Sequence, residues 1–183
     1  MERKLCTILA LDVVGFSKMM ATDEDQTLRV LNSRREFIDA SISDHGGRIF
    51  NTAGDSVLAE FTSPVRAVEC GVQIKNKSMA INAESDEKDQ MRYRVGINIG
   101  DVMVSNENLF GDAVNIAARL EAEAIADGIC ISDSIYDLVN LKVKVSYEDA
   151  GDLELKNIGR RLRAYNVLKG KGAPRGLRCD DDE

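Results

Sequence analysis

Features that mark several other protein classes are missing from this sequence of 183 residues. No apolar run approaches the length of a membrane span, and the first residues lack the apolar core of a signal peptide, so we expect a cytoplasmic domain. The single histidine, His45, follows a predicted helix and is assigned no chemistry. The cysteines lack the paired spacing of a zinc site or redox motif, and we expect reduced, mostly buried thiols at Cys6, Cys70, Cys130 and Cys179.

Basic residues are too few for a nucleic-acid-binding face. The chain has 24 Lys and Arg against 31 Asp and Glu, a net charge of −7, whereas such a face needs a basic patch. A nucleotide whose phosphates arrive with a metal ion is compatible with this charge. The length suffices for one domain with a sizeable core, and 44% hydrophobic with 30% charged residues is typical of a globular protein.

The predicted fold is organised around residues 49–61. Two short strands, 49–53 and 56–61, flank a hairpin turn whose second residue is Asp55. Another carboxylate, Asp12, ends the apolar strand 4–11. If these strands are neighbours, the two carboxylates lie side by side, which suits hard cations and the phosphates they carry. A Gly-Asp pair is also a common hairpin turn without chemistry.

Helices and strands alternate along the rest of the chain, and the hairpins require antiparallel pairing. We therefore predict an α+β domain over residues 1–168, with helices packed on an antiparallel sheet, and a tail or linker at 169–183. The expected helices are one capped by Thr22 and stopped at 45–47, one opened by Ser63-Pro64, one at 111–124 and a brief one, capped by Ser132 or Asp133, that ends at 139. The expected further strands are 93–99, with a bulge or bend at Gly100-Asp101 before 102–104, then 128–132, 143–147, 153–156 and 162–168.

A second group of polar residues lies on the helix predicted at 111–124. Asn115 and Arg119 are four residues apart, so they lie one above the other on the face turned away from its apolar side. An amide and a guanidinium in that arrangement suit a sugar oxygen and a phosphate oxygen of one ligand. An isolated pair of this kind is also found on ordinary solvated helix faces.

Taken together, these segments resemble one family. The sequences DVVGFS at 12–17, GDS at 54–56 and FGDAVNIAAR at 110–119 have the order and spacing of the class III nucleotidyl cyclase catalytic domain. The resemblance covers residues 4–168. It implies a ferredoxin-like or palm-type antiparallel sheet flanked by helices, and an adenylate cyclase that converts ATP to cyclic AMP and pyrophosphate.

The resemblance also implies roles for individual residues. Asp12 and Asp55 match the aspartates that hold two divalent ions, Mg²⁺ or Mn²⁺, with the Val13 carbonyl as a further ligand. Asn115 matches the residue that orients the ribose, and Arg119 the one that stabilises charge on the reacting phosphate.

Three more residues match positions around the triphosphate. Phe16 and Ser17 lie in the loop that wraps it, and Lys156 matches a lysine that binds the terminal phosphates. Such domains work as head-to-tail homodimers with two shared active sites, to which one subunit supplies the aspartates and the other the Asn/Arg helix.

The residues at the base-recognition positions depart from the family pattern. Asn51 and Asn108 stand where well-studied adenylate cyclases have a lysine and an aspartate, and asparagine can read adenine or guanine. Asp101 stands near the position of a further phosphate-binding arginine. A guanylate or relaxed-specificity cyclase and a non-catalytic dimerisation or nucleotide-sensing module stay open as alternatives, and regulatory domains on the same chain are compatible with the sequence.

Overall fold

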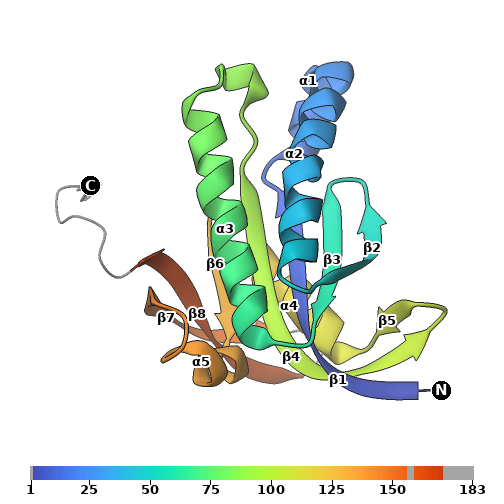
Figure 1. Cartoon of the computed structure of the whole chain (residues 1–183), viewed down its shortest axis with the longest axis vertical. Coiled ribbons are helices and arrows are strands. Elements are labelled where there is room, and N and C mark those ends of the chain that lie inside the picture. Colours follow the sequence, from blue (N-terminus) through green and yellow to red (C-terminus); the bar gives the residue numbers. More distant parts are fainter. Residues whose placement is uncertain (1, 156–158, 171–183) are drawn as a thin grey trace.

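The computed structural model of this chain describes residues 2–155 and 159–170, with the last two as backbone only. Strands and helices alternate along it (Figure 1). In chain order they are β1 (Glu2–Val13), α1 (Phe16–Thr22), α2 (Glu24–Asp44), β2 (Arg48–Ala53), β3 (Ser56–Phe61), α3 (Pro64–Ala83), the 3₁₀ turn η1 (Glu87–Asp89), β4 (Tyr93–Ser105), β5 (Asn108–Phe110), α4 (Asp112–Glu123), β6 (Ile129–Ser132), α5 (Asp133–Val139), β7 (Val145–Leu155) and β8 (Arg160–Gly170).

The strands form one sheet in the order β2-β3-β1-β4-β6-β8-β7, with β5 paired to β4. All pairs in this described sheet are antiparallel except β4 and β6, which run parallel. A parallel pair needs a crossover connection, and here that connection contains α4. The predicted α+β architecture is confirmed, with this one parallel pair added to it.

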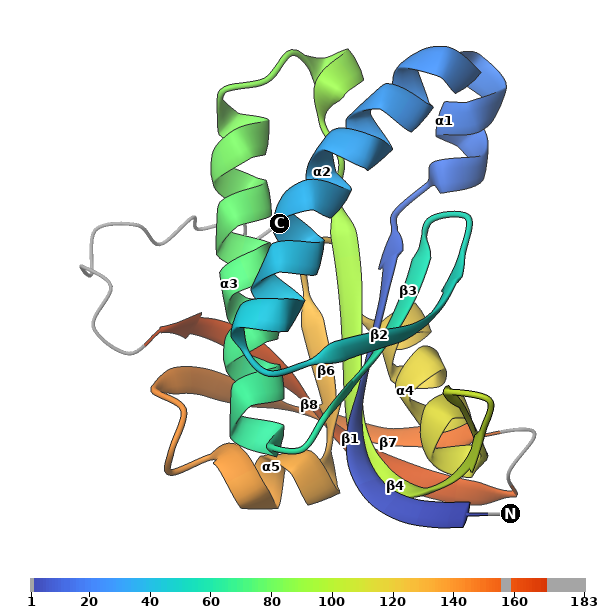
Figure 2. The same ribbon diagram turned by 45° about the vertical axis from the view of Figure 1, so that its right-hand side comes forward.

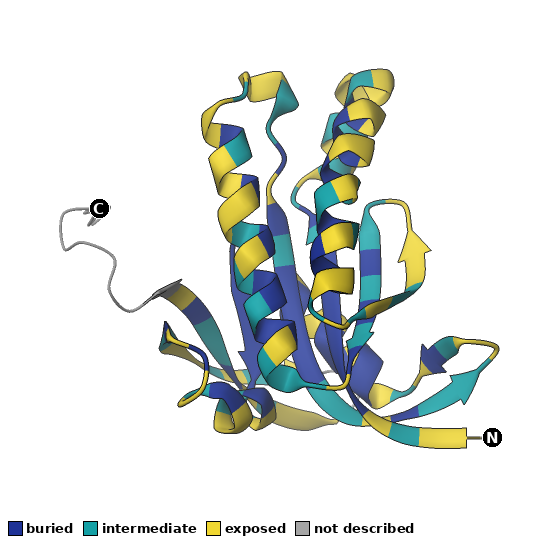
Figure 3. Cartoon of the chain, viewed as in Figure 1, coloured by how far each residue is buried: buried dark blue, intermediate teal, exposed yellow. Residues whose placement is uncertain are grey.

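Helices cover both faces of the sheet. Figures 1 and 2 show α2 and α3 side by side on one face and α4 on the other. The larger core lies under α2 and α3 and includes Leu9, Leu11, Ile38, Ile74 and Ile97. On the opposite face, Ile8, Ala10 and Val102 pack against Ala113 and Ala117 of α4. Figure 3 shows the resulting pattern, with buried central strands and exposed outer helix faces.

Strand β4 provides the seat for α4. A Cβ atom on Gly96 would lie 2.2 Å from the backbone N of Glu121, and one on Gly100 would lie 2.7 Å from Ala113 Cβ. Between these glycines, Asn98 Nδ2 donates to the carbonyl of Ala113 at 3.1 Å. The glycines therefore permit a close approach of helix to sheet. Of the bulge or bend predicted at Gly100-Asp101, the bulge is wrong, because the β1–β4 pairing continues through both residues without a register shift.

Some predicted element boundaries also differ from the structure. The cap of α2 is Asp23, whose carboxylate accepts from the Gln26 amide at 3.1 Å. Thr22 belongs to the preceding helix α1, where its hydroxyl donates to the Lys18 carbonyl. Ser132 is the cap of α5. The parts of the strands predicted at 143–147 and 153–156 that lie within Val145–Leu155 belong to one irregular strand, β7, which stays paired with β8; residue 156 lies outside the described residues.

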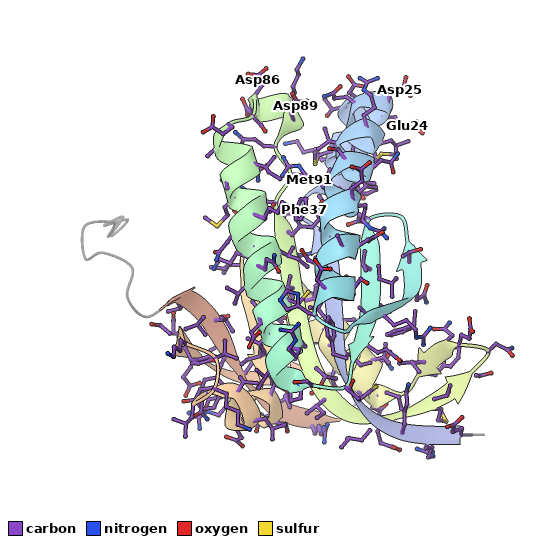
Figure 4. The ribbon with its side chains drawn as sticks, in the orientation of Figure 1. Glu24, Asp25, Phe37, Asp86, Asp89 and Met91 are labelled. Carbon is purple, nitrogen blue, oxygen red and sulfur yellow. The ribbon has the colours of Figure 1, made fainter. Side chains whose placement is uncertain are left out.

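A buried arginine joins α2, α3 and the segment before β4. Arg34 is 3% exposed, and its Nη2 donates to Asn82 Oδ1 at 2.7 Å and to the Asp89 carbonyl at 3.0 Å. Asn82 in turn pairs with the backbone of Met91. Figure 4 shows Met91 and Phe37 between the two helices, below acidic residues such as Asp86. This network fixes the chain where it enters β4.

Three cysteines lie in the core, as predicted. Cys6, Cys70 and Cys130 are free and buried, and burial raises the pKa of Cys70 to about 12 and that of Cys130 to about 11. Cys179 lies outside the described residues. None of the helices in the described ranges is long and apolar enough to cross a membrane.

Candidate functional site

The two predicted metal aspartates lie next to each other at one end of the sheet. Strands β1 and β3 are antiparallel neighbours, which places the end of β1 beside the β2–β3 turn. The backbone N–H of Val13 donates to Asp55 Oδ2 at 2.9 Å. Both aspartates are half-buried. The condition on which the sequence placed the two carboxylates side by side, that their strands are neighbours, is met.

Arg94, on the adjacent strand β4, holds the carboxylate of Asp12 from the side. Its Nε donates to Oδ1 at 3.2 Å and its Nη2 to Oδ2 at 3.1 Å. A third bond runs from Nη1 to the carbonyl of Ala122 at 3.1 Å. These hydrogen bonds with Asp12 raise the pKa of Arg94. Arg94 thus joins β1 to the C-terminal end of α4 and stays cationic.

Glu121 of α4 completes this cluster. Its side chain faces the sheet and is 7% exposed, and its Oε1 lies 3.7 Å from Arg94 Nη2 without a hydrogen-bond partner in the described part of the chain. Burial, followed by a hydrogen bond with Asp12, raises the pKa of Glu121. This direction favours the protonated form of Glu121, which can donate to the Asp12 carboxylate.

Asn115 and Arg119 lie on the other side of α4. Both are exposed, whereas Ala113, Ala117 and Glu121 form the row that faces β4. Arg119 pairs with Glu123 at 2.9 Å along the outer face. A helix turns by about 200° over two residues, so Arg119 and Glu121 point in opposite directions. Within one subunit, the structure does not bring Asn115 and Arg119 to the aspartates.

Two predicted triphosphate-binding residues begin the first helix, directly after the strand that carries Asp12. Phe16 is half-buried against the larger core, and Ser17 is exposed. Lys156, predicted to bind the terminal phosphates, lies outside the described residues.

The two predicted base-recognition residues come from neighbouring elements. Asn51 is exposed on β2, and Asn108 begins β5 with its Oδ1 accepting from the Leu109 amide at 2.9 Å. Arg48 of β2 donates to the Glu107 carbonyl beside β5 at 2.8 Å. Asp101 is paired with Arg3 at 2.8 Å on the exposed surface.

The donors at the aspartate pair fit a hard divalent ion. Asp12, Asp55 and the Val13 carbonyl offer only oxygen atoms, which Mg²⁺ and Mn²⁺ prefer. Among residues 2–155 and 159–170, no group of three or more His, Cys, Asp or Glu side chains could hold an ion by itself. A site with two carboxylates suits an ion whose other ligands are substrate phosphates and water.

Sequence reasoning missed Arg94 and Glu121. The alternation of residues 93–99 showed that Arg94, Gly96 and Asn98 share one face of the strand, but not that a helix covers this face. The signal in the sequence was the pair of glycines at 96 and 100, since small residues on one strand face permit a close backbone approach.

A comparison with protein families identifies the chain. The model of the adenylate and guanylate cyclase catalytic domain matches residues 2–170. The chain belongs to this family. Its cyclase fold agrees with the topology described above, and the family resemblance of the sequence is confirmed.

Individual relatives agree with this assignment. The protein named "Putative adenylate cyclase 3" of Rhizobium meliloti (strain 1021) is 42% identical over 165 residues, which are 90% of this chain and 28% of that protein. A crystal structure of an adenylate/guanylate cyclase/hydrolase from Silicibacter pomeroyi matches with a TM-score of 0.81 and 39% identity, covering 92% of this chain and 98% of that one. The adenylyl cyclase CyaB of P. aeruginosa has the same fold, with a TM-score of 0.81 at 23% identity over 93% of this chain and 97% of that one.

Proposed function

We propose that this chain is the catalytic domain of an adenylate cyclase, which converts ATP to cyclic AMP and pyrophosphate in a homodimer. One observation supports this proposal most directly. Asp12 and Asp55 lie together at the sheet end, while Asn115 and Arg119 face outward from α4, away from the aspartates of the same subunit. Two incomplete half-sites of this kind are complementary, so a second copy of the chain completes each of them.

Asp12, Asp55 and the Val13 carbonyl would hold two divalent ions, Mg²⁺ or Mn²⁺. When bound, these ions supply a lowered pKa for the ribose 3′-hydroxyl and charge neutralisation for the pyrophosphate leaving group. The hydrogen bond from Val13 to Asp55 fixes the aspartate turn against the end of β1. The aspartates are therefore held in place before substrate arrives, which lowers the cost of ordering them.

Asn115 and Arg119 of the partner subunit act on the ribose and the α-phosphate. The amide of Asn115 orients the ribose so that its 3′-oxygen attacks in line. As the new O–P bond forms and the bond to pyrophosphate breaks, the guanidinium of Arg119 stabilises the charge that develops on the α-phosphate. Both side chains are exposed on one face of a regular helix, as such a role requires.

The polyphosphate tail lies along the segment that follows Asp12. Phe16 and Ser17 begin α1, where backbone amides and the Ser17 hydroxyl are available to phosphate oxygens. Lys156 contributes a positive charge to the terminal phosphates. These assignments rest on the family resemblance together with the position of α1 directly after the aspartate strand.

Asn51 and Asn108 read the base. The side-chain oxygen Oδ1 of Asn108 accepts a hydrogen bond from the backbone N–H of Leu109, which leaves the side-chain NH₂ group of Asn108 as a donor for the base. That donor suits N1 of adenine and also O6 of guanine. This feature makes a guanylate or relaxed-specificity cyclase the second candidate.

We further propose that the catalytic domain spans residues 1–168 and that 169–183 is a tail or linker, although strand β8 runs two residues past this boundary, to Gly170. The chain spans 28% of the length of its Rhizobium relative, which supports a place for regulatory domains beside it.

Cyclic nucleotide formation with Mn²⁺ plus ATP or GTP tests the proposal, at several protein concentrations, for wild type and Asp55→Ala. We expect cyclic AMP, a rate that rises more than linearly with protein concentration, and loss of the product in the variant. Absence of product from either nucleotide, at concentrations where the protein is dimeric, overturns the assignment as an enzyme. A faster rate with GTP selects the second candidate.

A further inference from the structure

One arginine faces two carboxyl groups that belong to different parts of the proposed active site. Arg94 Nη2 lies 3.1 Å from Asp12 Oδ2 and 3.7 Å from Glu121 Oε1. Asp12 is on the ion-binding strand β1, and Glu121 is on α4, two residues after Arg119. The guanidinium is therefore hydrogen-bonded to one carboxylate and close to a second carboxyl group.

Arg94 competes with any ion for Asp12. Its two hydrogen bonds engage both oxygens of the Asp12 carboxylate in the fork-shaped geometry that arginine favours. The pair is only partly exposed, with 29% of the arginine side chain and 23% of the aspartate side chain accessible. Each of these oxygens keeps a second lone pair, so an ion that coordinates Asp12 would lie close to the guanidinium, and the repulsion between the two positive charges weakens the hold of Arg94 on Asp12.

Glu121 offers a place for the displaced guanidinium. Its side chain is more than nine-tenths buried and lies within hydrogen-bonding reach of Asp12, but its Oε1 accepts no hydrogen bond within the described residues. Buried polar atoms normally have a partner. The Nη2 that binds Asp12 lies 3.7 Å from this oxygen, and Nη1 of the same guanidinium donates to the Ala122 carbonyl.

We propose that Arg94 is an exchangeable counterion, which leaves Asp12 for Glu121 Oε1 when a divalent ion binds Asp12. This inference rests on the ion-binding role of Asp12 in the proposed function. In this inference Arg94 is a positioning residue, since it acts on the ion site through Asp12. In the proposed dimer, it touches the ion site of one active centre and the helix that serves the other.

Binding of Mn²⁺ alone to the purified chain tests this exchange, with the free ion measured by electron paramagnetic resonance. Binding that is lost in Asp12→Ala defines the site. We expect Arg94→Gln to bind Mn²⁺ about tenfold more tightly than wild type, because the competing cation is gone. Arg94→Lys keeps the positive charge but cannot make the two-point contact with Asp12, so we expect its Mn²⁺ affinity to lie between those of wild type and Arg94→Gln. The matched control Arg92→Gln removes an equal charge two residues away and leaves the affinity unchanged.

Glu121 variants test the second half of the exchange. Glu121→Leu removes the receiving oxygen and weakens Mn²⁺ binding about fivefold, whereas Glu121→Gln keeps that oxygen and binds as wild type does. In the Arg94→Gln background, Glu121→Leu has a smaller effect than in wild type, because no guanidinium remains to be received and only the direct contact of Glu121 with Asp12 is lost.

The outcomes separate this inference from the proposed function. Two results overturn the exchange alone. One is Asp12-dependent Mn²⁺ binding that is equally tight or weaker in a folded Arg94→Gln than in wild type. The other is a Glu121→Leu effect on Mn²⁺ affinity of the same size with and without Arg94. Absence of Asp12-dependent binding in wild type overturns both the exchange and the ion-binding role. The predicted order of affinities supports the exchange, whether or not a cyclic nucleotide is formed.

Discussion

The amide of Val13 and the carboxylate of Asp55 are joined by a hydrogen bond of 2.9 Å, which ties the end of β1 to the turn between β2 and β3. Asp55 therefore has a structural partner in addition to its proposed ion. A variant that removes the whole side chain changes both at once. Variants of this residue need to separate the two effects.

Asp55→Asn makes that separation. The amide oxygen still accepts from the Val13 N–H, so we expect a melting temperature close to that of wild type. The charge needed by the ions is lost, and the rate of cyclic nucleotide formation falls by about a hundredfold or more. Rate and thermal melting are measured on the same preparation. A rate within about tenfold of wild type contradicts the role of Asp55 as an ion ligand.

Mixing of two inactive variants tests the shared active site. Asp55→Ala lacks an ion ligand, and Arg119→Ala lacks the guanidinium on the outer face of α4. In a mixed dimer, one site combines both defects and the other site combines the two intact halves. With free exchange at equal amounts, half of the dimers are mixed, and about a quarter of the wild-type activity returns. The control mixes Asp12→Ala with Asp55→Ala, which damage the same half-site, and recovers nothing. Equal recovery in both mixtures refutes the shared site.

Asn108→Asp shifts base preference toward ATP. The carboxylate still accepts from the Leu109 amide, and its second oxygen accepts from the adenine 6-amino group but repels the guanine 6-oxygen. Loss of a suitable partner for a base edge typically costs about 1–3 kcal/mol, so the ratio of ATP to GTP turnover rises about tenfold. Parallel assays with both nucleotides measure it. An unchanged ratio removes Asn108 from base recognition.

Asn82→Ala destabilises the fold by about 3 kcal/mol, because it leaves Arg34 and the Met91 backbone without buried partners. Urea unfolding measures the change. The matched control is Asn76→Ala on the exposed side of the same helix, with an expected change within about 0.5 kcal/mol. Similar losses in both variants would mean that the buried network contributes little.

Glu60 makes stability depend on pH in the acid range. Partial burial pushes its pKa up, but hydrogen bonds from Arg48 and Lys4 outweigh burial and hold the pKa below its ordinary value of 4.5. A carboxyl whose pKa is lowered by folding stabilises the fold above its unfolded pKa and loses this contribution as pH falls through the folded value. Wild type should thus be more stable than Glu60→Gln at neutral pH. The difference should shrink below about pH 4.5, as urea unfolding at several pH values shows; a constant difference contradicts it.

Local sequence predicted the parts of the site that local rules determine. The turn at Asp55, the end of a strand at Asp12 and the spacing of Asn115 and Arg119 follow from turn chemistry and helical periodicity. The boundary at Thr22 failed because Asp23, the next residue, is an equally good cap and has the extended backbone that a cap requires.

Contacts between distant segments were beyond such rules. Arg94 contacts Asp12, which is 82 residues away, and Ala122, which is 28 residues away. The face of β4 that carries Arg94, Gly96 and Asn98 is covered by α4. This position of α4 follows from the parallel pairing of β4 with β6, because α4 lies in the crossover between the two strands. Gly100 was interpreted as a strand irregularity because the sequence does not show that α4 folds back onto β4 and brings Ala113 against this glycine.

The close packing of α4 on β4 bears on how the proposed enzyme can be regulated. A Cβ atom at position 96 would lie 2.2 Å from the Glu121 backbone N, so helix and strand are in direct backbone contact. The backbone positions of Asn115 and Arg119 are therefore coupled to the sheet. In the proposed homodimer, a rotation of one subunit against the other would carry these two residues toward or away from the partner's aspartates together with β4.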